Sequence, residues 1–357
     1  MSFYISNLKT GDEISRPDWT KSIKRNPDQL WLDKNENPDP TLSKYIVDLA
    51  SSIPSQHFFA YPDLAAIYLK LAKHLDVDPY NLLLSHGSDG AIRSIFEAFI
   101  SYGDSVLITK PTFAMYEVYS KIYKCNTLLL NYLPSSKGPV LKLKTIISEL
   151  KKHRPKLFCL PNPDSPTGHI LALEDIEEIC KSCQETNTLL LIDEAYYPVS
   201  EVDCIPLINK FDNLIVIRTT AKAWGMAGLR VGFAASSKEL IIRMHNVRPM
   251  YEINNIGAYI FDKLLDNYQK VLDSANRLND AKSFFAKSLI KLGYEVVKCD
   301  GNFILVKFGE KLNHIDKCLE GKVLYSKVAS SHTSLSAYSR FSLGTKDQMK
   351  FVLSLIS

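Results

Sequence analysis

The chain has 357 residues, 46% hydrophobic and 23% charged, which is the composition of an ordinary globular protein with room for one large and one smaller domain. Its net charge of +4 is too small to argue for a nucleic-acid or membrane partner. The N-terminus lacks an apolar segment of signal-peptide length, no run approaches a membrane span, and 7 scattered cysteines indicate free thiols in a reducing compartment. We therefore expect a soluble, cytoplasmic protein.

The sequence offers no convincing metal site. Cys180 and Cys183 form a C-x-x-C pair, but they lie inside a helical pattern and no second pair accompanies them. The eight histidines show no ligand spacing. We expect no bound metal.

Residues 1–50 are expected to be irregular, and the spacing of apolar residues predicts a helix over 64–75. Beyond them, short apolar runs alternate with helical patterns. This alternation predicts an α/β fold with a mostly parallel sheet and helices on both faces. Ligands bind such sheets outside the carboxyl ends of the strands. The predicted strands are 82–85, 105–109, 127–130, 157–160, 188–192, 214–217 and 231–235.

The pattern changes near residue 255. A long helical region to residue 292 precedes strand-like pieces at 294–298, 302–308, 322–326 and 339–343, and a final helix closes the chain. These elements predict a smaller α+β domain. We expect a large domain over 52–254 and a small domain formed by 1–51 together with 255–357.

The segment 214–233 carries the strongest chemical signal. Its apolar strand leads into Lys222, whose neighbours Ala221, Ala223 and Trp224 carry no charge. A lysine picked blindly is a solvated surface residue, but partial desolvation here would lower its pKa and let its amine form a Schiff base with a carbonyl. Arg230 could clamp a phosphate. A phosphorylated aldehyde, pyridoxal 5′-phosphate (PLP), would satisfy both residues.

This segment closely resembles the S-K-x-x-x-x-A-G-x-R-x-G signature of PLP-dependent enzymes of fold type I, the aspartate aminotransferase fold. It resembles histidinol-phosphate aminotransferases in particular, as does the N-E-N-P element within 31–40. The chain departs from the signature at Ala221, where the family has serine. The resemblance implies the fold type I architecture and PLP held covalently by Lys222.

The segment TLLLIDEAYYP (188–198) gives the next strongest signal. Asp193 ends an apolar strand, where its carboxylate could pair with the pyridinium nitrogen and keep the ring an electron sink. The alternative is a plain helix cap. The resemblance implies that Tyr196 bonds the phenolic oxygen of the cofactor. Ser165 stands where the family has a second partner of that oxygen, an asparagine, and a hydroxyl has only one donor.

The GSDG turn (87–90) opens a predicted helix, whose free N–H groups favour an anion, although a simple turn is an equal alternative. The family usually has glutamate at Gly90. The resemblance implies that the cofactor phosphate is held by the Ser88 and Asp89 amides and by Thr219. It also implies that Phe113, otherwise a core aromatic, stacks on the pyridine ring.

By the same resemblance, Tyr61 would reach the phosphate of the other subunit, so we expect a homodimer. Arg340 corresponds to the family arginine that grips the substrate carboxylate. Counting back from Arg340 without gaps places Lys327 where histidinol-phosphate enzymes have an arginine for the substrate phosphate.

The predicted function is PLP-dependent amino transfer between an amino acid donor and a small, phosphorylated keto or amino compound. One alternative is a decarboxylase of a phosphorylated amino acid, similar to threonine-phosphate decarboxylase. A non-catalytic PLP-binding regulator is disfavoured, since this chain has no room for the DNA-binding domain that such proteins usually carry.

Overall fold

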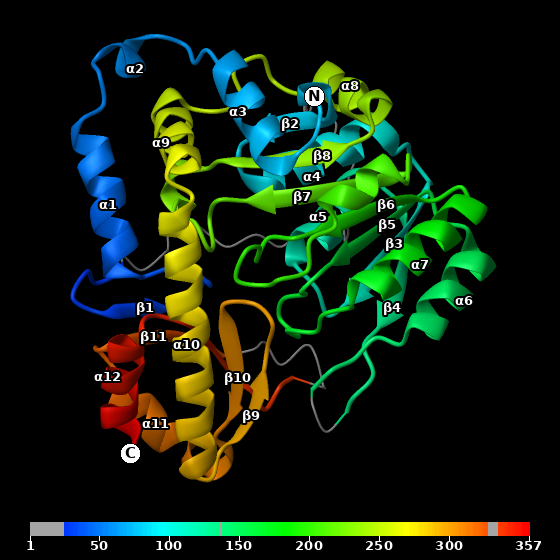
Figure 1. The fold of residues 1–357 in the computed structure, drawn as a ribbon. Coiled ribbons are helices and arrows are strands. Elements are labelled where there is room, and N and C mark those ends of the chain that lie inside the picture. The colour runs from blue at the N-terminus through cyan, green and yellow to red at the C-terminus, as the bar shows by residue number, and fades with distance from the viewer. Residues whose placement is uncertain (1–24, 136–137, 328–334) are drawn as a thin grey trace, which may run out of the picture.

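A computed structural model describes residues 25–135, 138–327 and 335–357. Two β-sheets organise these residues (Figure 1), and we call them the large sheet and the small sheet. The large sheet has seven strands in the order β2-β8-β7-β6-β5-β3-β4, and the small sheet has five in the order β1-β11-β12-β10-β9.

All seven strands of the large sheet coincide with predicted apolar runs. Strands β3 to β7 run parallel to one another, whereas β8 is antiparallel to both β2 and β7. The strands are β2 (Leu82–Ser85), β3 (Ser105–Lys110), β4 (Asn126–Asn131), β5 (Leu157–Pro161), β6 (Leu189–Asp193), β7 (Leu214–Thr219) and β8 (Gly232–Ser236).

Continuous apolar runs form these strands because helices bury both faces of the sheet. Alternate residues of β6 divide between two hydrophobic clusters: Leu190 and Ile192 join one, and Leu191 joins the other. The first face is covered by α3 (Ala65–Leu75), α6 (Leu143–His153), α7 (Leu173–Glu185) and α9 (Asn255–Asp266). The second is covered by α4 (Gly87–Phe99), α5 (Ala114–Ile122) and α8 (Lys238–Val247).

The small sheet joins chain segments that lie far apart in the sequence. Its strands are β1 (Leu30–Leu32), β9 (Glu295–Lys298), β10 (Phe303–Lys307), β11 (Val323–Lys327) and β12 (Ser339–Ser342). β1 pairs with β11 in parallel, and the other neighbours are antiparallel. Helices α11 (Leu312–Leu319) and α12 (Lys346–Ile356) pack against it.

Helix α10 (Gln269–Lys291) connects the two sheets and is the long helix of Figure 1. Its first half, with Leu278, belongs to the core of the large sheet, and its second half, with Phe285, belongs to the core of the small sheet. The predicted long helical region over 255–292 is therefore two helices, α9 and α10, separated near residue 267.

The prediction that residues 1–50 are irregular is wrong for the described part of that segment. It contains β1 and α1 (Pro40–Ser51), which Asp39 caps by accepting from the Thr41 N–H, and α2 (Gln56–Phe59) follows soon after. The large sheet lies within 52–254, and the small sheet takes strands from both flanking segments. We retain the division into two domains as a proposal; residues 1–24 of the proposed small domain lie outside the described residues.

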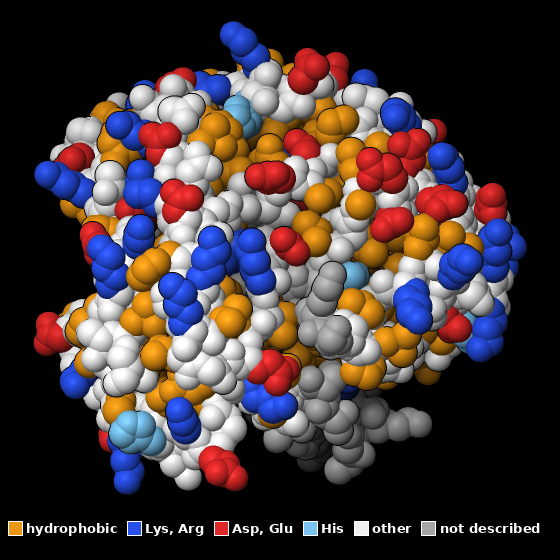
Figure 2. All heavy atoms as spheres, turned by 60° about the horizontal axis from the view of Figure 1, so that its bottom comes forward, with side chains coloured by type: hydrophobic (Ala, Val, Ile, Leu, Met, Phe, Trp, Pro, Cys, Tyr) orange, Lys and Arg blue, Asp and Glu red, His pale blue; other side chains and the backbone are white. Residues whose placement is uncertain are grey.

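The surface carries both signs of charge. Figure 2 shows lysine and arginine side chains interspersed with acidic ones over one face, in keeping with the small net charge of +4. None of the helices in the described ranges combines the length and apolar character needed to cross a bilayer.

Candidate active site

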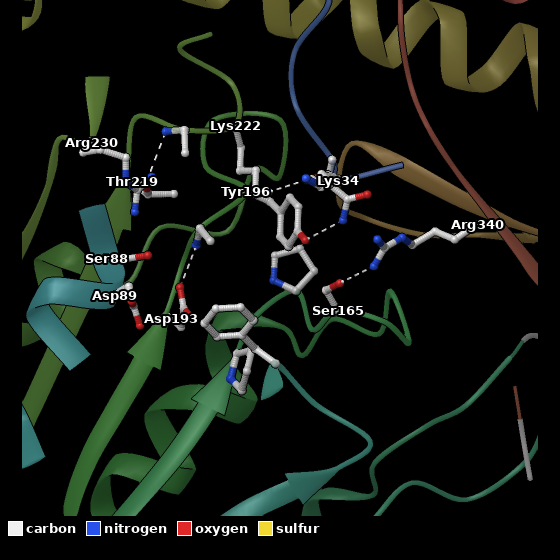
Figure 3. A pocket seen from close by; sticks show the side chains of 16 residues that line it. Lys34, Ser88, Asp89, Ser165, Asp193, Tyr196, Thr219, Lys222, Arg230 and Arg340 are labelled. Atoms are coloured by element: carbon white, nitrogen blue, oxygen red, sulfur yellow. Dashed lines mark hydrogen bonds between the residues drawn. The ribbon is translucent and has the colours of Figure 1, made fainter. Parts of the chain in front are cut away.

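A cavity of about 350 Å³ lies at the carboxyl ends of the parallel strands, where the fold class predicts a ligand site. Figure 3 shows side chains from both sheets converging on it. Of the predicted site residues, ten line this cavity: Ser88, Asp89, Phe113, Ser165, Asp193, Tyr196, Thr219, Lys222, Arg230 and Arg340.

Lys222 lies just beyond the end of β7 and its side chain is half-buried. Its Nζ donates a hydrogen bond of 2.8 Å to the backbone carbonyl of Lys34. Burial, reinforced by repulsion from Arg340 and Arg230, lowers the pKa of Lys222 to about 8. About a tenth of the amine is therefore neutral at pH 7, far more than for an ordinary lysine, and the neutral form is the nucleophile.

Asp193 is the last residue of β6 and is only 5% exposed. Its Oδ2 accepts from the Tyr116 hydroxyl at 2.8 Å, and its Oδ1 accepts from the Ala195 N–H at 3.0 Å. Burial raises the pKa of Asp193 to about 6, while these two hydrogen bonds oppose the rise. A turn follows β6, so Asp193 caps no helix, and its buried carboxylate is placed to pair with a cation in the cavity.

The beginning of α4 and the end of β7 form a positively polarised corner. Gly87 opens α4 with φ +71°, and a Cβ there would lie 2.5 Å from Nη2 of Arg230. A Cβ at Gly232 would lie 2.6 Å from the Ser88 nitrogen, so β8 also needs a glycine to approach this turn. Helical N–H groups beside an arginine make an anion site.

Arg340 comes from β12 in the small sheet and forms the opposite wall. Its Nη2 donates to the Asp33 carbonyl at 2.8 Å, and its Nη1 donates to Ser165 Oγ at 3.3 Å. The Nε atom is buried and has no partner within the described residues. Nearby, the Tyr196 hydroxyl accepts from Asn35 Nδ2 at 2.9 Å.

Comparisons with known proteins agree with this arrangement. The family described as Aminotransferase class I and II matches residues 27–356. The chain belongs to this family. It is 30% identical over 333 residues to the histidinol-phosphate aminotransferase of Caldanaerobacter subterraneus subsp. tengcongensis, covering 92% of this chain and 93% of that protein. It is 35% identical over 285 residues to that of Thermoanaerobacter sp. (strain X514), covering 79% of each.

Solved structures show the same fold. The histidinol-phosphate aminotransferase of Sinorhizobium meliloti, in complex with pyridoxal-5′-phosphate, superposes with a TM-score of 0.78 at 19% identity and covers 97% of both chains. That of Clostridium acetobutylicum gives 0.78 at 19% identity, covering 91% of this chain and 98% of the other. The protein is thus a PLP-dependent aminotransferase of fold type I.

The residues of the cavity fit pyridoxal phosphate. An amine with a lowered pKa matches its aldehyde, the corner of α4 and Arg230 matches its phosphate, and the buried carboxylate of Asp193 matches its ring nitrogen. Phe113 also lines the cavity and is 41% exposed, so its ring is open to stacking by a flat ligand. The Phe113 side chain is therefore not the core aromatic of the alternative interpretation.

Two predicted site residues lie elsewhere. Lys327 belongs to a separate cavity beside α11, where its Nζ lies 2.5 Å from Asp316 Oδ2. This position corrects the prediction, made by counting back from Arg340 without gaps, that Lys327 binds the substrate phosphate. β11 directs Lys327 to an ion pair outside the aminotransferase cavity. Tyr61 is 73% exposed and stacks on Tyr251, with ring centroids 3.9 Å apart, and it does not line the cavity of its own subunit.

Some contributors escaped the sequence analysis. Tyr116, Lys34 and Asn35 belong to segments with family resemblance but were given no roles. Glu252 has no motif at all, yet its Oε1 lies 2.7 Å from the place where a Cβ at Gly90 would be. A carboxylate from a distant segment thus occupies space beside the residue where the family usually has glutamate. Only the three-dimensional structure could show that the carboxylate of Glu252 lies beside Gly90.

Proposed function

We propose that this aminotransferase moves an amino group between an α-amino acid donor and a small keto or amino compound with a second anionic group, of the histidinol phosphate class. The observation that supports this proposal best is the shared cavity of Lys222, Asp193 and Arg340. It combines a nucleophilic amine, a buried carboxylate and an arginine with an unpartnered buried Nε. The names of the relatives at 30–35% identity support the same substrate class.

When bound here, pyridoxal phosphate supplies an electron-withdrawing ring that stabilises negative charge on the substrate carbon. Lys222 would hold the cofactor carbonyl through Nζ. As a free amine beside the substrate, the same Nζ would accept a proton from the substrate carbon and donate it back. Its lowered pKa, about 8, suits both the basic and the acidic role near neutral pH.

Asp193 would keep the ring nitrogen protonated, and its two hydrogen bonds hold the carboxylate in one orientation. Tyr196 and Ser165, which also line the cavity, would bond the phenolic oxygen of the cofactor, with the hydroxyl of Ser165 in place of an amide. Phe113 would stack on the ring. The phosphate is assigned to Arg230, Thr219 and the amides of Ser88 and Asp89.

Arg340 is assigned to the first anionic group of the substrate. A guanidinium presents parallel N–H groups that match a planar carboxylate or a phosphate. Arg340 is already anchored to the Asp33 carbonyl, so its orientation is set before substrate enters. Binding an anion would also satisfy its unpartnered Nε.

We further propose that the enzyme is a homodimer in which Tyr61 serves the neighbouring subunit. Its ring lies away from its own cavity, and stacking on Tyr251 fixes its orientation. A large aromatic side chain that is 73% exposed suits burial against a second copy of the chain.

A substrate panel tests the reaction. Purified holoenzyme is incubated with glutamate or other amino donors and with phosphorylated and unphosphorylated keto acceptors, while amine transfer and carbon dioxide release are measured together. Histidinol phosphate, with 2-oxoglutarate as the acceptor, is the key reverse-direction substrate. We expect amine transfer without carbon dioxide. Carbon dioxide release from a phosphorylated amino acid would replace this proposal with the decarboxylase alternative.

A further inference from the structure

The charge of the cavity exceeds what the cofactor and one substrate anion use. Among the described residues that line it, four are cationic, Lys34, Lys222, Arg230 and Arg340, and two are acidic, Asp89 and Asp193. Arg230 is assigned to the cofactor phosphate, Lys222 to its carbonyl and Arg340 to the first anionic group of the substrate. Lys34 is the cation without an assignment.

Lys34 lies at the mouth of the cavity, since it lines the cavity and is exposed to solvent. Within the described part of the chain, its ammonium has neither a hydrogen-bond nor an ion-pair partner. The nearby acids are already engaged: Arg25 binds Asp33 at 2.6 Å through Nη2 and Glu36 at 2.7 Å through Nη1. Arg25 thus leaves Lys34 without a counter-ion from its own segment.

The backbone of Lys34 is fixed even though its side chain is solvated. Its carbonyl accepts from Lys222 Nζ at 2.8 Å, and Asn35, the next residue, donates its backbone N–H to Ser342 Oγ at 2.7 Å. The stem of Lys34 therefore starts from a defined point beside the catalytic amine. A flexible four-carbon stem then lets the ammonium follow groups of different length.

We infer that Lys34 binds the second, distal anionic group of the substrate and so selects dianionic substrates over monoanionic ones. This inference rests on the proposed amino transfer and assigns a residue to its substrate selectivity. The shared chemistry is an oxyanion held by an ammonium. It could be a distal carboxylate, as in a dicarboxylic amino donor, or the phosphate of a phosphorylated partner.

Unreactive acids test the inference without turnover. Isothermal titration calorimetry on the holoenzyme compares glutarate with pentanoate, which has the same number of carbons but one charge, and with 2-carboxyethylphosphonate. The variants are Lys34→Met, which removes the charge, and Lys34→Arg, which keeps it. Lys44→Met, at an exposed lysine of α1, is the matched control.

For Lys34→Met we expect the two dianions to bind about tenfold more weakly, the low end for a charge-assisted contact because the ammonium is solvated. Pentanoate should change less than about twofold, because it offers no distal charge. Lys34→Arg should retain most of the difference in affinity between the dianions and pentanoate, and Lys44→Met should show the native affinities. A larger loss for the phosphonate identifies phosphate as the preferred group, and a larger loss for glutarate identifies carboxylate.

Equal losses for mono- and dianions, or no loss, would overturn the assignment. A charge-selective loss in Lys327→Met with none in Lys34→Met would overturn it as well, in favour of Lys327. Failure of the proposed reaction is recognised separately, because the substrate panel would show no amine transfer while the binding contrast persisted.

Discussion

The hydrogen bond between Tyr116 and Asp193 gives the sharpest test of the site. Tyr116→Phe removes only the hydroxyl that donates to Asp193 Oδ2 at 2.8 Å in the buried floor of the cavity. A hydrogen bond to a charged group contributes about 1.5–3 kcal/mol, and one pKa unit corresponds to about 1.36 kcal/mol. Losing it destabilises the ionised carboxylate, so the pKa of Asp193, about 6 in the native protein, should rise by about one to two pH units.

The sign of the effect follows from the role of the ionised carboxylate. Below its pKa, Asp193 is protonated and cannot hold the ring N–H, so cofactor affinity falls as the pH falls through that value. In Tyr116→Phe the fall should therefore begin at higher pH. The assay is titration of the apoenzyme with pyridoxamine 5′-phosphate across pH 5–9, because this form lacks the aldehyde and makes no bond to Lys222.

Ionisation of the phosphate affects both proteins equally, so the difference between their curves reports Asp193. Tyr102→Phe, at an exposed tyrosine, is the control and should reproduce the native curve. A Tyr116→Phe curve that coincides with the native one would refute the reasoning. A loss of the same size at every pH would point instead to altered packing.

Three other outcomes are expected. Capture of pyridoxal phosphate by the apoenzyme should accelerate with pH and reach half its maximal rate near pH 8, since only the neutral amine of Lys222 attacks. The Lys222→Ala variant should form no borohydride-reducible link to the cofactor. Turnover of that variant at the native rate would disprove the role of Lys222. Asp193→Asn should lower kcat at least about a hundredfold with little change in Tm, and an unchanged rate and cofactor spectrum would leave Asp193 a structural residue. Inactive Tyr61→Ala and Lys222→Ala proteins, when mixed and reassembled, should regain partial activity; none regained despite measured subunit exchange would place Tyr61 in its own site.

The sequence predicts the large sheet well because its strands need no distant partner to be recognised. Apart from the partly exposed edge strand β4, each is a short apolar run whose residues are almost all buried. β1 has three residues, and its pairing with β11 joins Leu30 to Val323. A segment so short has no internal periodicity, so only its distant partner makes it a strand.

The same distinction applies to the cavity. Residues at or just beyond the carboxyl ends of parallel strands, such as Asp193 and Lys222, converge because strand ends share one edge of the sheet. An ungapped count back from Arg340 predicts Lys327 as a phosphate ligand, but the two residues lie on separate strands, so the count depends on the length of the connection between β11 and β12. Glu252 approaches Gly90 only through folding, and no local pattern marks it.

The pairing of β1 with β11 also bears on when the enzyme matures. The Lys34 carbonyl accepts a hydrogen bond from Lys222 and follows strand β1, whose partner β11 comes late in the sequence. Arg340, on β12, comes later still. At about 5–20 residues per second, translation exposes Lys222 on the order of ten seconds before Arg340. A nascent chain can thus form the large sheet before Arg340, the residue assigned to the substrate anion, is in place. Cofactor captured in that interval would enter an open site, and the competent cavity forms only once β12 has paired with β10.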